Sequence, residues 1–156
     1  MVRGLDRSHI RDSYQIVGAR EASVAEKAGP RFRPSDADRM DEHRAAMAAS
    51  LDADDFDAYY AANLAFHDVY LDLSDNEELV RTVRTLKERL YDFPRRSSYV
   101  KEWEVESTAE HAEITARFRS GDYASAAEYV RGVHWNFEVQ ERYIRKYYFA
   151  AGGGGR

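Results

Sequence analysis

The chain has 156 residues and a net charge of −5, which suits one domain with a hydrophobic core and argues against a chain that coats nucleic acid by itself. It contains no cysteine, which excludes disulfides and thiolate metal sites and leaves His, Asp, Glu and Asn as possible metal ligands. Because no apolar run approaches the roughly 18 residues of a membrane-spanning helix and the N-terminus lacks a signal-peptide core, we expect a soluble, cytoplasmic protein.

The first part of the chain has the apolar spacing of three amphipathic helices. Between residues 6 and 27, apolar side chains recur at steps of three and four, which predicts the first helix. A second helix is expected to open near Pro34, with Ser35 as its N-cap. A third is expected to start near residue 54 or 55.

The pattern continues through two more helices. Asp75-Asn76 breaks the third helix and is expected to cap a fourth that runs to about residue 93. A longer connection follows. The fifth helix is predicted from about Trp103 to Arg119, with Val105 among its inward residues.

The last helix begins after a tight turn. Gly121 suits a left-handed C-cap and Asp122 suits the N-cap of a helix from about Tyr123 to Phe149. The glycine-rich residues 150–156 have few side chains to pack and are expected to be disordered. No run of alternating β-branched residues occurs, so residues 5–149 are predicted to form an all-α antiparallel bundle of about six helices.

Three of the five histidines fall on apolar helical stripes. His67, His111 and His134 lie on three different predicted helices, whereas His9 and His43 sit among charged residues and are expected at the surface. Burying imidazoles without partners costs roughly a few kcal/mol per polar group, while one divalent metal satisfies all three. Three nitrogen ligands with open coordination positions suit Zn, Ni, Mn or Fe rather than Ca or Mg.

Asn63 lies one helical turn before His67, on the same side of its helix. Its carbonyl oxygen could be a fourth metal ligand, or its amide could be a hydrogen-bonding neighbour of the site, and the sequence leaves both open. Because all these ligands are neutral, the ion would keep its full positive charge. It would then favour an anionic oxygen ligand, such as a small carboxylate, in its open positions.

Aromatic and basic residues are the candidates for the rest of the pocket. Arginines could supply a carboxylate clamp, and aromatic rings could line the cavity. The candidates are Tyr59, Tyr60, Tyr70, Tyr91 and Trp135 for the walls, and Arg20, Arg95 or Arg117 for the clamp. Aromatic residues at helical spacing more often form the core, and arginines more often lie on solvated faces, so a purely structural role competes with this assignment.

Three functions fit the histidine pattern: a ligand sensor, a metal-dependent enzyme acting on a small carboxylate, and a metal-free helical interaction domain with histidines in its core. An enzyme would need a general base beside the metal. Glu110 and Asp68 each adjoin a histidine in sequence, but neighbouring side chains on a helix point about 100° apart. Both are therefore predicted to lie outside the pocket, which argues against the enzyme.

The order and spacing of several motifs resemble a known family, the FCD effector domain. This is the C-terminal ligand-binding domain of FadR-subfamily GntR transcription regulators, and the resemblance covers about Leu5 to Tyr148. Glu21 matches a glutamate near the end of the family's first helix. The other motifs, in chain order, are Asn63-x-x-Phe66-His67, the Ser74-Asp-Asn76 break, Glu110-His111-x-x-Ile114, the Arg119-Ser-Gly-Asp122 turn and a last helix with His134.

The resemblance implies an antiparallel helical bundle that binds a small organic acid, often through a divalent metal held by three histidines and an Asp or Asn. It also implies a homodimer whose DNA contacts are made by a winged helix-turn-helix domain preceding this one. The chain begins at the first effector helix, as a piece of a longer regulator or as a domain that stands alone. The metal ligands carry over to His67, His111, His134 and Asn63.

Two positions depart from the family's pattern. Asn63 stands where an aspartate is commoner, which would weaken or change the metal preference. An arginine often found on the first helix falls on Val17, although Arg20 lies nearby and could take over part of its role.

Overall fold

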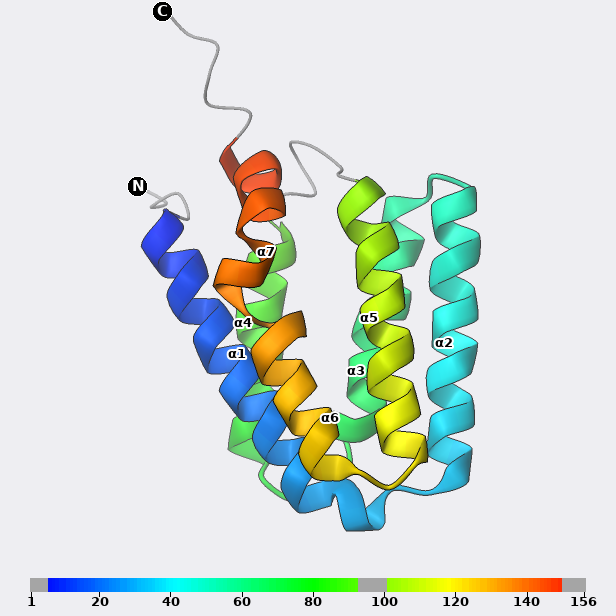
Figure 1. Cartoon of the computed structure of the whole chain (residues 1–156). Helices are drawn as coiled ribbons and strands as arrows, with labels where there is room; N and C mark the ends of the chain where they lie inside the picture. The colour runs from blue at the N-terminus through cyan, green and yellow to red at the C-terminus, as the bar shows by residue number, and fades with distance from the viewer. Residues whose placement is uncertain (1–5, 93–100, 150–156) are drawn as a thin grey trace, which may run out of the picture.

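Helices account for most of the residues that the computed structural model describes, 6–92 and 101–149 (Figure 1). No strand occurs within these two ranges, which confirms the all-α prediction. The predicted tail at residues 150–156 and the connection that contains Arg95 lie outside the described residues. The helices are α1 (Arg7–Ala28), α2 (Pro34–Asp52), α3 (Phe56–Leu71), α4 (Glu77–Asp92), α5 (Lys101–Arg119), α6 (Tyr123–Tyr129) and α7 (Phe137–Ile144), with shorter helical turns η1 (Gly29–Arg31), η3 (Val130–His134) and η4 (Arg145–Phe149).

Successive long helices run in opposite directions through the bundle, as the prediction required (Figure 1). Helix α2 packs against α3 and α5, whereas α1 packs against α4, α6 and η3. Helix α1 also contacts α3, which joins the two groups into one core. No helix in residues 6–92 or 101–149 is long and apolar enough to cross a membrane.

Short polar side chains start most of the helices. Asn76 accepts a hydrogen bond from the backbone N–H of Leu79 (3.0 Å), and Asp122 accepts one from Ser125 (3.1 Å), so both predicted caps are confirmed. Gly121 has φ = +76°, the left-handed conformation predicted for the turn before α6. The Ser35 cap is wrong, because α2 begins one residue earlier at Pro34 and the Asp36 carboxylate binds the Arg33 N–H (2.8 Å).

The last helix is not continuous as predicted. Helix α6 passes into the π-helical turn η3, where the Trp135 N–H donates to the Val130 carbonyl (2.9 Å). The helix ends at Trp135. Asn136 then caps the start of α7 by accepting a hydrogen bond from the Val139 N–H (3.1 Å). The wide turn therefore ends on His134, one of the three predicted ligands.

The buried stripe of α5 differs by one residue from the predicted one. Val105 is 54% exposed, so its predicted inward position is wrong. The stripe passes instead through Glu104, which is 7% exposed, and continues seven residues later through the fully buried His111. Two turns of helix separate these residues, and both therefore face the core.

Candidate metal centre

His67, His111 and His134 converge in the core of the bundle from α3, α5 and η3. Each offers one ring nitrogen, and these three atoms all lie within 4.8 Å of one another. The closest recorded pair is His67 Nε2 and His134 Nε2, 3.2 Å apart. All three side chains are buried. His9 is exposed and His43 is half-buried, and neither belongs to this group.

The His111 ring lacks any hydrogen-bond partner among the described residues, at either nitrogen. Burial, together with the neighbouring His134 and His67, lowers the pKa of His111 well below its ordinary value. The ring is therefore neutral and keeps a lone pair, as a metal ligand must. A buried imidazole without a hydrogen-bond partner destabilises the folded state, and a cation bound to its lone pair would remove this destabilisation. The donor set thus fits a divalent transition metal.

His67 is held in one orientation from behind. Its Nδ1 lies 2.8 Å from Glu21 Oε1 and 2.7 Å from the Tyr70 hydroxyl, which also donates to Glu21. Burial lowers the pKa of His67 to about 3, although Glu21 opposes the shift, so the ring is neutral with its proton on Nδ1. Nε2 is therefore the free ligand atom, and it faces His134.

The carboxylate behind His67 belongs to a buried ion pair. Lys87 Nζ lies 2.9 Å from Glu21 Oε2, with both side chains almost completely buried. Burial alone would raise the pKa of Glu21, but His67, Lys87 and the hydrogen bonds from His67 and Tyr70 hold it below its usual value. Sequence reasoning missed Lys87, although it shares an inward stripe of α4 with the buried Val83 and Leu90.

His134 is held by a second carboxylate. Its Nδ1 lies 2.9 Å from Glu110 Oε1, and the Gln140 amide donates to both Glu110 oxygens (3.2 and 3.0 Å). The prediction that Glu110 lies outside the pocket is wrong. Its direction differs from that of His111, as expected, but it points at the neighbouring η3 rather than at solvent. Asp68 lies outside, as predicted, 3.2 Å from Arg84.

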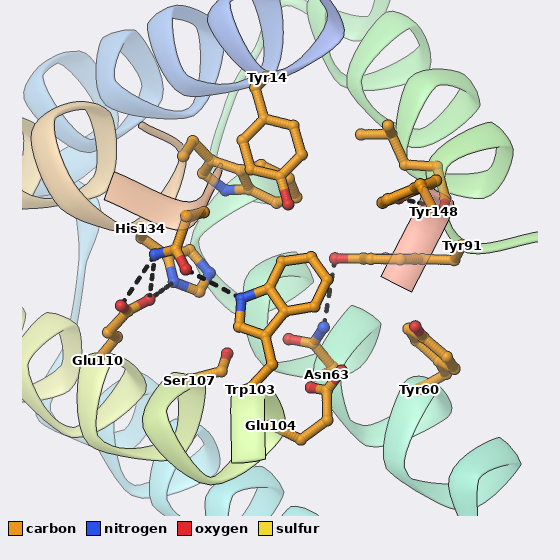
Figure 2. Close-up of a pocket in the computed structure, with 13 residues that line it drawn as sticks. Tyr14, Tyr60, Asn63, Tyr91, Trp103, Glu104, Ser107, Glu110, His134 and Tyr148 are labelled. Carbon is orange, nitrogen blue, oxygen red and sulfur yellow. Dashed lines mark hydrogen bonds and ion pairs between the residues drawn. The ribbon is translucent and has the colours of Figure 1, made fainter. Parts of the chain in front are cut away.

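A cavity opens beside His134 (Figure 2). Its volume is about 40 Å³. This corresponds to roughly three or four waters, so a ligand that enters without rearrangement is small. The lining residues are Tyr14, Tyr60, Asn63, Leu90, Tyr91, Trp103, Glu104, Ser107, Glu110, His134, Trp135, Gln140 and Tyr148.

Asn63 lines this cavity, with its two amide atoms in different environments. Its Nδ2 donates to the Tyr91 hydroxyl (3.2 Å), whereas its Oδ1 is buried without a hydrogen-bond partner among the described residues. Tyr60 packs on the Tyr91 ring with centroids 4.7 Å apart. Tyr60 and Tyr91 thus stand where a ligand beside Asn63 would meet them.

The other candidates lie elsewhere. Tyr70 is buried behind His67, against Glu21, and Arg20 is exposed on α1 beside a separate surface groove. Arg117 lies 3.6 Å from Glu113 and over the Tyr129 ring. Sequence reasoning did not single out Trp103, Glu104, Gln140 or Tyr148, four of the residues that line the cavity.

The match to known families agrees with this architecture. A protein-family model for the FCD domain matches residues 12–133, more than half of the chain. No curated protein and no solved structure matches the chain significantly. FCD domains are the regulatory ligand-binding domains of GntR-family transcription regulators and are not enzymes. The helical bundle and its match over residues 12–133 show that this chain belongs to the FCD domain family.

Proposed function

We propose that this chain senses a small carboxylate for a GntR-type, FadR-like transcription regulator, by means of a divalent transition metal held by His67, His111 and His134. The observation that carries the proposal is the fully buried His111, with both ring nitrogens unpaired among the described residues. The convergence of the other two imidazoles on the same point supports it. The buried ammonium of Lys87 pairs with Glu21, behind His67.

The residues around the histidines suit this role. Glu21 and Glu110 each bind the Nδ1 of a histidine, which turns the Nε2 atoms of His67 and His134 toward each other. Asn63 Oδ1 is the candidate for a further oxygen ligand or for a contact to metal-bound water. When bound, a Zn, Ni, Mn or Fe ion would supply positive charge and open positions for a carboxylate oxygen.

The cavity borders seven segments of the bundle, including α7 through Gln140, which gives a ligand a means to change the arrangement of helices. Its lining includes Tyr14 from α1, Leu90 from α4 and Tyr148 from η4, besides residues of α3, α5 and η3. A ligand that favours one arrangement of these helices would shift the population toward it. We propose that the regulator works as a cytoplasmic homodimer and that α1 passes this change to a DNA-binding domain.

Metal analysis of the purified protein and thermal unfolding with and without chelator test the proposal. We expect close to one metal ion per chain, a lower melting temperature after chelation, and recovery on adding zinc or nickel. Small carboxylates should raise the melting temperature of the metal-loaded protein and not that of the chelated protein. A protein that holds no metal and ignores both chelator and carboxylates would be a metal-free interaction domain, and the proposal would be wrong.

A further inference from the structure

The cavity beside His134 is lined by acidic rather than basic side chains, which is unexpected for a site that binds a carboxylate. Among its described lining residues there are two carboxyl groups, Glu104 and Glu110, and no lysine or arginine. Glu110 is already engaged by His134 and Gln140. Glu104 is the one whose role the metal site does not explain.

Glu104 is buried at the wall of the cavity, and among the described residues no lysine or arginine forms an ion pair with it. Its side chain belongs to a residue that is only 7% exposed, and no ion pair recorded for residues 6–92 and 101–149 includes it. Burial raises the pKa of Glu104 to about 7, and hydrogen bonding with the Tyr59 side chain lowers this pKa by a smaller amount. An ionised carboxylate there would be poorly compensated, so a positively charged or hydrogen-bond-donating ligand group would stabilise it.

The walls around Glu104 also suit a cation. Figure 2 shows Asn63 and Glu104 pointing into a pocket that is bordered by the rings of Trp103, Tyr60 and Tyr91. Trp103 is held in place, since its Nε1 donates to Gln140 Oε1 (2.9 Å). The faces of aromatic rings attract ammonium groups, and a carboxylate among them adds a charged acceptor.

We infer that the ligand is an amino-carboxylate, whose carboxylate is received at the histidines and whose ammonium group is received by Glu104 among the aromatic rings. The inference rests on the proposed function, because the histidine end must take the carboxylate. Where Glu104 is ionised, at a pH above its raised pKa, a dicarboxylate of the same length would bring its second charge to Glu104 and be repelled. The Oδ1 of Asn63, which has no hydrogen-bond partner among the described residues, lies on the same wall and is a second acceptor for the ammonium protons when it is not bound to metal.

Isothermal titration calorimetry with zinc-loaded protein, dialysed free of excess metal at a pH above the pKa of Glu104, tests this. The probes are 2-aminopropanoate, 3-aminopropanoate and 4-aminobutanoate, each compared with the matching plain acid and with the diacid of the same chain length. We expect the best amino acid to bind about 10- to 100-fold more tightly than its plain acid, the range for a charge-assisted hydrogen bond. Diacids should be the weakest.

The Glu104→Gln variant separates a ligand contact from a structural role, since it keeps the shape and removes the charge. In this variant we expect the affinity for the amino acids to fall about 10-fold or more and the affinity for the diacids to rise. Glu106→Gln, at an exposed position of the same helix, should leave both unchanged. A general loss of affinity for all three classes in Glu104→Gln would indicate a structural effect and overturn the inference.

The failures are distinguishable. If the wild-type protein binds carboxylates through its metal but prefers diacids or plain acids, the amino-carboxylate assignment is wrong and the proposed function stands. If no carboxylate of any class binds the zinc-loaded protein, the proposed function itself is wrong and the inference falls with it.

Discussion

His67 Nε2 and His134 Nε2 lie 3.2 Å apart while each ring has a carboxylate at its Nδ1. With both protons on Nδ1, two lone pairs face each other in the core, an arrangement that is unfavourable unless a proton or a cation lies against both. Two imidazole nitrogens on one tetrahedral zinc are separated by about 3.3 Å, given zinc–nitrogen bonds of about 2.0–2.1 Å. The observed separation suits two ligands of one ion, and it also suits a hydrogen bond between the two rings in the metal-free protein.

Removal of one of these ligands should abolish stable metal binding. We expect His134→Ala to lower the metal content of the purified protein sharply, because only two histidines remain to hold the ion. His43→Ala, at a half-buried position outside the cluster, should retain the wild-type content. The measurement is elemental analysis after dialysis, and equal losses in the two variants would refute the assignment.

The carboxylate behind His67 should control metal affinity without touching the metal. Glu21→Gln keeps an acceptor near His67 Nδ1 but removes the charge, so metal affinity should fall about 10- to 100-fold. A competition titration against a chelator of known affinity measures this. The control is Glu26→Gln, at an exposed position of the same helix, which should bind metal as the wild-type does.

Close packing of α1 on the last helix should also affect the metal centre. A Cβ atom at Gly18 would lie 3.0 Å from Trp135 Cβ, so Gly18→Ala must push this residue and the adjacent His134 away from α1. We expect lower metal affinity and a loss of about 1–3 kcal/mol in stability, reduced by the better helix propensity of alanine.

Gly132→Ala is the matched control, because a Cβ there meets nothing within 4 Å. It should leave metal affinity unchanged and, if anything, stabilise the protein by roughly 0.5–1 kcal/mol. Chemical denaturation and metal titration of the two variants give both quantities. Identical behaviour would show that the contact between α1 and η3 does not position His134.

The metal-free protein should lose stability in mild acid through its buried histidines. The pKa of His67 is lowered to about 3 and that of His111 is also lowered, so the unfolded chain binds more protons than the folded one below about pH 6.5. Each group therefore destabilises the fold by up to about 1.4 kcal/mol per pH unit as the pH falls from about 6.5 toward the folded-state pKa.

Glu104 has the opposite effect on the pH dependence of stability. Burial raises its pKa to about 7, so between that value and its unfolded value of about 4.5 the folded state binds the extra proton and gains stability as the pH falls. Denaturation of the metal-free protein at several pH values should thus show a steeper loss for Glu104→Gln than for the wild-type. His111→Leu should show a shallower loss, and parallel curves for all three would contradict the assignment of these protons.

Local spacing in the sequence predicted most of the fold and the convergence of the histidines, because a helix places every third or fourth residue on the same side. His67, His111 and His134 could be recognised from their own helices alone. The residues that hydrogen-bond to these histidines could not be recognised in this way. Glu110 reaches His134 and Lys87 reaches Glu21 only because particular helices lie next to each other, and periodicity does not specify which neighbours meet.

The break in the last helix was missed for a related reason. A π-helical turn inside an α-helix leaves the spacing of apolar residues almost unchanged, so the sequence around His134 predicts a continuous helix. Asn136 was the available signal, since asparagine is a good N-cap and the chain caps α7 there. The exposed Val105 shows the limit of hydrophobicity as a guide, because the inward side of α5 carries Glu104 instead.

The buried pair of Glu21 and Lys87 cancels its own charge, which leaves Glu110 as the remaining negative group among the residues that hold the histidines. A divalent ion would then leave a surplus of one positive charge in the interior until a carboxylate arrives. Metal and carboxylate would therefore raise each other's affinity by the same factor. In a cell with little of the metal, the regulator would respond only at a higher concentration of the carboxylate. Its response would therefore depend on the concentrations of both the metal and the carboxylate.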